Sequence, residues 1–229
     1  MNKKTFSSEM TRQLYMKAEK VPSNVYSSLH RQFLTPLPLL CDNVERDFST
    51  IQELFYQWGD NRVELKTRKG CALVNLDGKN TPDDSSIGPL DYHNRKHSKG
   101  LASKCYIEGD FTTHTEQMKY MKSLQQFDLC RSSILWWQRG DNFTPHIDVL
   151  LPAPNLRLWG CTNSAHMQLR YGEDMIESEF ESNRLYLIDT SVIHDATALG
   201  EVYQFFIGLL PTEKNYNILQ ELILDYLTD

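Results

Sequence analysis

Short apolar runs separated by turn residues dominate the second half of the chain. Several of these runs alternate apolar and polar positions or carry β-branched and aromatic residues, which is typical of strands. They cover residues 133–138, 146–151, 156–161, 166–171, 184–189 and 203–210. Short strands that follow one another at this spacing predict a closed or nearly closed antiparallel barrel, such as a double-stranded β-helix of the jelly-roll or cupin-like kind.

The first half of the chain mixes other signals. Two prolines keep residues 34–40 extended, and apolar positions at steps of three and four predict an amphipathic helix over residues 42–58. An apolar run over 72–76 ends in a turn signal and predicts a strand, whereas the polar stretch 79–103 predicts a long loop. A short helix is expected over 118–127.

These patterns predict one domain over residues 1–229, mainly β with flanking helices. We expect a helical and extended flank over 1–60, the double-stranded β-helix over 61–212, and a C-terminal helix within 215–229. The last helix is predicted because Ile218, Leu219, Leu222 and Ile223 share one helical face.

Composition excludes several classes of function. The net charge of −6 and the pI of about 5.7 do not suggest the basic face that nucleic-acid binding would need. No apolar run reaches membrane-spanning length, and the N-terminus lacks the apolar core of a signal peptide. Five widely spaced cysteines without a C-x-x-C pair argue against a disulfide framework and a zinc ribbon. We therefore expect a cytoplasmic protein without nucleic-acid or membrane partners; its oligomeric state stays open.

The candidate chemistry lies in His146, Asp148 and His194. Two imidazoles and one carboxylate form the ligand set that holds Fe(II) on one face and leaves the other coordination positions open. His146 and Asp148 are two residues apart, so both side chains point to one face of a strand, and His194 follows another apolar run. The alternative is that a His-x-Asp pair arose by chance in a surface loop. We interpret the three residues as the metal ligands and catalytic centre.

With these residues in place, the segment 133–211 resembles the Fe(II)/2-oxoglutarate-dependent oxygenases, and within them the aspartyl/asparaginyl β-hydroxylase family. The segment 67–78 resembles the family's early strands less specifically. The resemblance implies a double-stranded β-helix, Fe(II) bound by the three ligands, and 2-oxoglutarate and O2 as cosubstrates. It also implies hydroxylation of a small molecule, an amino acid or an amino-acid-like metabolite, with release of succinate and CO2.

The resemblance also assigns residues to the cosubstrate. Arg157 matches a family arginine that contacts the oxoacid, and Trp159 stands where family members often have histidine. A second arginine, ten residues after the distal histidine, usually pairs with the far carboxylate of 2-oxoglutarate, and this chain has Gln204 there. Arg170 or Arg139 could take over that role from neighbouring strands. Arg139, Trp137 and Trp159 are candidate substrate contacts.

Two other functions stay open. Because Gln204 is neutral, an iron oxidase or oxygenase of the same fold could work without 2-oxoglutarate, its substrate chelating the iron directly. A non-enzymatic barrel that binds metal as a sensor is the other alternative. A structural zinc site fits less well, since it would require four protein ligands that fill every coordination position, with more cysteine sulfur among them.

Overall fold

The computed structural model describes residue 29 and residues 32–40, 56–57, 69–75, 110–111, 119–147, 156–210 and 212–228. The strands are β1 (Leu34–Leu40), β2 (Tyr56–Gln57), β3 (Lys69–Asn75), β4 (Asp110–Phe111), β5 (Leu129–Trp137), β6 (Asn142–His146), β7 (Leu156–Cys161), β8 (Met167–Tyr171), β9 (Ile176–Glu177), β10 (Arg184–Ile188), β11 (His194–Ala198) and β12 (Val202–Leu209). The helices are the 3-10 helices η4 (Lys119–Gln126) and η5 (Ser164–His166) and the α-helix α6 (Glu213–Thr228).

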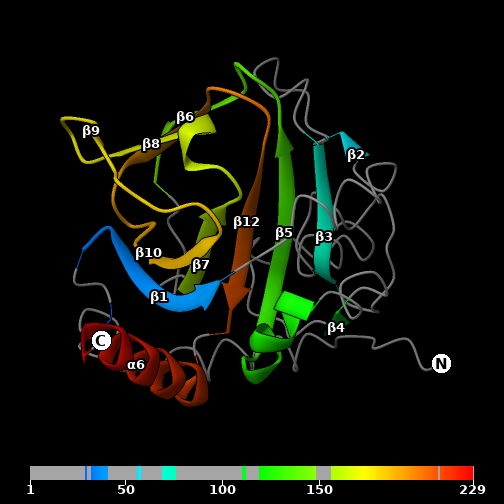
Figure 1. The fold of residues 1–229 in the computed structure, drawn as a ribbon, viewed down its shortest axis with the longest axis vertical. Coiled ribbons are helices and arrows are strands. Elements are labelled where there is room, and N and C mark those ends of the chain that lie inside the picture. The colour runs from blue at the N-terminus through cyan, green and yellow to red at the C-terminus, as the bar shows by residue number, and fades with distance from the viewer. Residues whose placement is uncertain are drawn as a thin grey trace, which may run out of the picture.

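The strands β5 to β12 form one long antiparallel ribbon that folds back on itself (Figure 1). β5 pairs with β12, β6 with β11, β7 with β10 and β8 with β9. The ribbon is rolled up, so that β12 also pairs with β7 and β11 also pairs with β8. A rolled antiparallel ribbon of eight strands is the jelly roll, or double-stranded β-helix. The fold predicted from the sequence is therefore confirmed.

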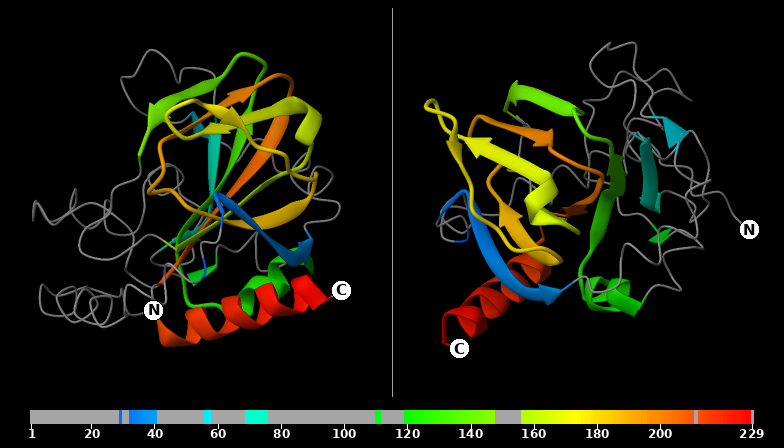
Figure 2. Two further views of the ribbon diagram at one scale, coloured as in Figure 1. Left: turned by 90° about the vertical axis from the view of Figure 1, so that its left-hand side faces the viewer. Right: turned by 45° about the horizontal axis from the view of Figure 1, so that its top comes forward.

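Rolling divides the strands between two sheets that face each other (Figure 2). The larger sheet has the order β1-β10-β7-β12-β5-β3-β2, with β4 beside β3, and the smaller sheet has the order β6-β11-β8-β9. β1 lies at the edge of the larger sheet, where Leu34 pairs with Ile188. An edge strand tolerates Pro36 and Pro38, because a proline cannot donate to a second neighbour.

Each face of the larger sheet carries its own apolar cluster. The outer cluster lies under α6 and includes Tyr216 and Leu219 of that helix. The inner cluster lies between the sheets and takes Trp159 from the larger sheet and Leu169 from the smaller one. Along β12 the side chains alternate between the clusters, so that residues 203, 205 and 207 face outward and 202 and 206 face inward. This alternation decides which side chains can reach a ligand inside the barrel.

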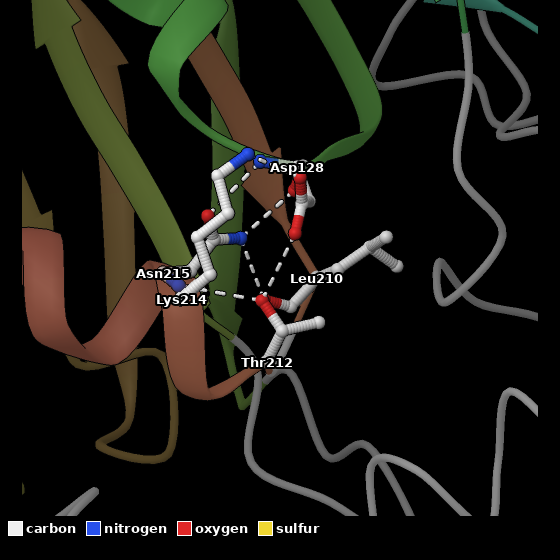
Figure 3. Close-up of polar contacts among 5 residues, drawn as sticks. All are labelled: Asp128, Leu210, Thr212, Lys214 and Asn215. Carbon is white, nitrogen blue, oxygen red and sulfur yellow. Dashed lines mark hydrogen bonds and ion pairs between the residues drawn. The ribbon is translucent and has the colours of Figure 1, made fainter.

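The C-terminal helix is tied to the start of β5 by a polar network (Figure 3). Asn215 accepts from the Asp128 backbone N–H at 2.9 Å and donates to the carbonyls of Asp128 and Leu210 at 2.9 and 2.8 Å. Lys214 forms an ion pair with the Asp128 carboxylate at 2.6 Å, and the Thr212 hydroxyl donates to that carboxylate. These contacts hold α6 across the outer cluster, below β1 in Figure 1.

Several predicted elements need correction. Before the expected strand 146–151, residues 142–146 form β6, because they pair with β11; residues 148–151 lie outside the described residues. His194 begins β11 and does not end an earlier strand. Residues 56–57, expected in a helix, pair with β3, and the short helix before β5 has 3-10 geometry.

The expected loop over 79–103 and most of the expected helix over 42–58 lie outside the described residues. The division into a flank over 1–60, a barrel over 61–212 and a terminal helix stays a prediction. No helix in the described part of the chain is long and apolar enough to cross a membrane.

Candidate metal centre

Two of the three expected metal ligands lie side by side in the smaller sheet. His146 at the end of β6 and His194 at the start of β11 are directly paired across the two strands. Their ring centroids are 4.5 Å apart, with an angle of 49° between the planes. Directly opposed residues of an antiparallel pair project from the same face, so both imidazoles point the same way. The fold thus brings together side chains that are 48 residues apart in the sequence.

Both imidazole rings are held by the backbone two residues before them. Nδ1 of His146 lies 2.7 Å from the Thr144 carbonyl oxygen, and Nδ1 of His194 lies 2.8 Å from the Val192 carbonyl oxygen. A carbonyl oxygen only accepts, so each Nδ1–H donates and each Nε2 carries the lone pair. Metal-binding histidines are commonly oriented by such a bond from the second ring nitrogen. The two rings are therefore in the tautomer that ligates a metal through Nε2.

The third expected ligand, Asp148, lies outside the described residues. Among the residues that are described, no three His, Cys, Asp or Glu side chains gather as a metal site. The structure thus places two of the expected ligands together, and the complete set of three stays a prediction.

Aromatic side chains surround the histidine pair. Phe143 lies 5.4 Å from the His146 ring and Phe33 lies 5.9 Å from the His194 ring, centroid to centroid. Phe33 also stacks on Tyr171 at 4.5 Å, and Tyr171 is paired with His194 across β8 and β11. An apolar wall of this kind limits solvent access and lowers the local dielectric constant around a bound ion. Sequence reasoning missed Phe33 and Tyr171, which come from distant segments without a motif.

A tight turn between β10 and β11 sets the position of His194. The Asp189 carboxylate accepts from the backbone N–H and the hydroxyl of Ser191, at 3.1 and 2.6 Å. Val192 N–H closes the turn onto the Asp189 carbonyl. Aspartate favours such turns because its side chain replaces a backbone acceptor. The chain therefore reverses direction just before His194 and delivers it to the first position of β11.

The larger sheet contributes a second set of candidate residues to the barrel interior. Trp137 and Trp159 belong to the inner cluster, and Arg157 lies on the same face of β7 as Trp159. The Arg157 side chain is 3% exposed, and its guanidinium carbon lies 3.7 Å from the centroid of the Phe206 ring. Gln204 is also 3% exposed and faces inward by the alternation along β12.

Arg157 lies toward the same end of the barrel as the histidines. Leu187 of β10 is paired with Leu158 of β7, so the next residue along β10, Ile188, lies beside Arg157, and Ile188 pairs with Leu34 of β1. The neighbouring residue Phe33 packs against the His194 ring. The expected cosubstrate contact Arg157 is thus on the inner face, a few side chains from the candidate metal ligands.

Arg170 does not lie where its predicted role requires. Leu169 belongs to the inner cluster and Tyr171 packs against it, so the intervening Arg170 points to the opposite face of β8. There its guanidinium forms an ion pair with the buried Asp195 carboxylate, its partner across β8 and β11, and this contact raises the pKa of Arg170. The expectation that Arg170 contacts a cosubstrate is therefore wrong. Arg139 is exposed in the turn after β5.

The comparisons with known proteins found similarity in structure only: no family model and no curated protein matches this sequence. The chain is similar to YcfD, a ribosomal oxygenase from Escherichia coli, in complex with cobalt and succinic acid. The identity is 18%, the match covers 41% of this chain and 27% of that chain, and the TM-score is 0.31.

Two further solved structures are similar to a comparable extent. A mutant of salicylate 1,2-dioxygenase from Pseudoaminobacter salicylatoxidans is 10% identical over 35% of this chain and 22% of that chain, with a TM-score of 0.29. The conserved protein SPY1581 of unknown function from Streptococcus pyogenes is 9% identical over 35% of this chain and 63% of that chain, with a TM-score of 0.28. This chain thus matches only about a quarter of the length of either oxygenase.

Proposed function

We propose that this protein is a non-haem Fe(II) oxygenase whose iron is held by His146, Asp148 and His194. The observation that carries the proposal is the paired arrangement of His146 and His194, whose rings are 4.5 Å apart and both anchored through Nδ1. Asp148, two residues after His146, supplies the carboxylate of the set.

The donor set favours iron over structural zinc. Two imidazoles and one carboxylate leave coordination positions open, whereas a structural zinc site is closed by four ligands that are usually rich in thiolate. The His146 and His194 rings contact each other, and Phe143 and Phe33 lie against them. The cysteines among the described residues are buried thiols, which also agrees with the expected reducing cytoplasm; they are Cys71, Cys130 and Cys161.

The proposal gives a task to each of the described site residues. His146 and His194 hold the metal through Nε2, and the carbonyls of Thr144 and Val192 keep their rings oriented. Arg157, stacked on an aromatic ring, presents its N–H edge to a carboxylate of the organic ligand. The iron, when bound, supplies the oxidation chemistry that acts on a C–H bond of the substrate.

The finer proposal is 2-oxoglutarate-dependent hydroxylation of an amino acid or a small amino-acid-like metabolite. The buried Arg157 supports it as a partner for an oxoacid carboxylate. The alternative, an iron oxygenase or oxidase that works without 2-oxoglutarate, is supported by Gln204. Its buried Oε1 has no hydrogen-bond partner and the side chain cannot balance a second carboxylate.

One titration tests both versions. The protein is reconstituted anaerobically with Fe(II), and 2-oxoglutarate is added while the weak visible metal-to-ligand charge-transfer band is followed. Appearance of the band, and later of succinate with a substrate, supports the 2-oxoglutarate-dependent version. Bound iron without the band refutes it in favour of the alternative. Failure to bind Fe(II) at all rejects both.

A further inference from the structure

A row of four paired residues crosses the smaller sheet at one end of the barrel, and the two candidate metal ligands form half of it. His146 of β6 is paired with His194 of β11. His194 is paired in turn with Tyr171 of β8, and Tyr171 is paired with Ile176 of β9. Residues that are directly paired across antiparallel strands project from the same face, so the row faces inward. We call Tyr171 and Ile176 the shelf, because they extend the row from the histidines to the edge strand of the sheet.

The β8–β9 hairpin holds the shelf in register with His194. The hairpin projects at the edge of the smaller sheet (Figure 1). Its turn is tight: Gly172 and Met175 have φ angles of 77° and 50°, and the Met175 N–H donates to the Gly172 carbonyl at 3.1 Å. The Gly172 N–H also donates to the carbonyl of Ile193 at 2.9 Å, one residue before His194. The shelf is therefore tied to the strand that carries a candidate metal ligand.

The shelf is supported by Phe33 and stays accessible to a ligand. Phe33 stacks on the Tyr171 ring, with centroids 4.5 Å apart and 9° between the planes. Phe33 is 7% exposed, whereas Tyr171 is half-buried and Ile176 is 53% exposed. A single exposed isoleucine is ordinary on a protein surface. This one continues an aromatic wall that begins at the candidate metal ligands, so an apolar group that extends from the histidines covers it.

The charged residues of the smaller sheet point away from the shelf. Arg170 alternates with inward-facing neighbours in β8, so it lies on the outer face, and its paired residues Asp195 and Glu177 lie there too. The strands β6, β8, β9 and β11 are described in full, and the inward residues that they place beside the histidines are uncharged; they are Phe143, Leu169, Tyr171, Ile176 and Ala196. The Ile176 side chain forms no hydrogen bond, so a polar group over it would lose its hydration without return.

The spacing of the strands sets the size of the group that reaches the shelf. Neighbouring strands lie about 4.8 Å apart, which puts Tyr171 about 5 Å and Ile176 about 10 Å from the backbone of His194. An aliphatic side chain as long as that of norleucine spans about one such spacing. A molecule whose reacting end faces the histidines therefore needs a side chain of this length to lie on the shelf.

We infer that the protein binds a substrate with an uncharged, apolar side chain, which lies on Tyr171 and Ile176 while the reacting end faces the histidine pair. The inference rests on the proposed function, because it names the substrate class of the same centre. Among amino acids and amino-acid-like metabolites, it selects those with a long aliphatic or an aromatic side chain over those with a polar one.

Two amino acids of matched length test the inference without turnover. L-norleucine has an aliphatic side chain, and L-glutamine has a side chain of the same length that ends in an uncharged amide. Each is titrated by calorimetry into the protein, with and without Zn(II) as a redox-silent metal and with and without 2-oxoglutarate. In the parent protein we expect norleucine to bind about 10-fold more tightly than glutamine, because the shelf buries aliphatic carbon and Ile176 gives the amide no partner.

Two equally exposed residues separate the shelf from general surface hydrophobicity. Ile176→Ser removes the aliphatic half of the shelf and should weaken norleucine binding about five-fold, while the affinity for glutamine stays the same. Leu199→Ser is the control, because Leu199 is 50% exposed but follows the other end of β11, and it should leave both affinities at the parent values. Neither substitution should move the melting temperature by more than about 1–2 °C, since both side chains are exposed.

The outcomes decide on the inference and on the proposed function separately. Glutamine binding as tightly as norleucine, equal effects of Ile176→Ser and Leu199→Ser, or no binding of either amino acid would overturn the shelf as the substrate site. Fe(II) binding is measured on its own and should be the same in the parent protein and both variants. Absence of Fe(II) binding together with a preference for norleucine would overturn the proposed oxygenase and leave the shelf as a binding site for apolar side chains.

Discussion

The buried side-chain amide of Asn215 attaches α6 to the barrel, and the loss of stability on removing this amide can be calculated. Asn215 is fully buried and makes three hydrogen bonds, two to the Asp128 backbone and one to the Leu210 carbonyl (Figure 3). We consider Asn215→Ala. The three bonds contribute about 1 kcal/mol each, and the Leu210 carbonyl keeps one partner in the variant, because it also accepts from the Thr212 backbone N–H.

Alanine at this position stabilises the helix by about 0.5 kcal/mol relative to asparagine, because its helix propensity is higher. The free energy of unfolding should therefore fall by about 2.5 kcal/mol. For a chain of 229 residues, this corresponds to a melting temperature lower by about 5–10 °C. Urea denaturation followed by circular dichroism measures the first quantity, and differential scanning calorimetry measures the second.

Asn217→Ala is the matched control. Asn217 lies in the same helix but is exposed, so the same chemical change removes no buried hydrogen bond. Its free energy of unfolding should stay at the parent value or rise slightly, because alanine favours the helix. Equal losses in the two variants, or a loss below about 1 kcal/mol in Asn215→Ala, would refute the assignment of this network as the anchor of α6.

Three further predictions concern packing, reactivity and the outer face of the smaller sheet. A Cβ atom on Gly160 would clash with the Arg184 carbonyl oxygen, so Gly160→Ala should lower the free energy of unfolding by about 1–3 kcal/mol. An unchanged denaturation midpoint would contradict this close approach of β7 and β10. Burial raises the pKa of Cys71 to about 12, so its thiol stays protonated at pH 8.5; peptide mapping should find it unmodified by iodoacetamide in the native protein and modified after unfolding. Arg170→Met removes the partner of the buried Asp195 carboxylate and should lower the melting temperature while Fe(II) affinity is kept; weaker binding of 2-oxoglutarate in this variant would contradict the outward placement of Arg170.

The strands that were predicted correctly are those that bury large side chains. β7, β10 and β12 carry leucine, isoleucine and aromatic residues on both faces, because each is covered on two sides. β11 was missed, since its inward positions after His194 are Ala196 and Ala198, which bury little area and give no apolar signal. β6 has a single large apolar residue, so its composition gives no strand signal. Its bounds are set by its pairing with β11.

The sequence singled out two candidate ligands that the structure places side by side, but it did not indicate their surroundings. His146 and His194 carry a recognisable donor set, and the structure brings them together. The aromatic wall could not be predicted, because Phe33 reaches His194 only through the pairing of β1 with β10. Arg170 was assigned to the wrong face, although strict alternation with the inward Leu169 would have placed it outside.

The most direct test of the proposed metal centre is anaerobic Fe(II) binding by equilibrium dialysis. The parent protein should bind one equivalent, and His146→Ala and His194→Ala should each weaken binding by more than about 100-fold, since even an outer-shell partner of a metal ligand is worth 10–100-fold. His166→Ala is the control, because the His166 ring bonds the Glu201 carbonyl and packs against Gly200. Binding that survives both ligand substitutions, or that is lost equally in the control, would contradict the account.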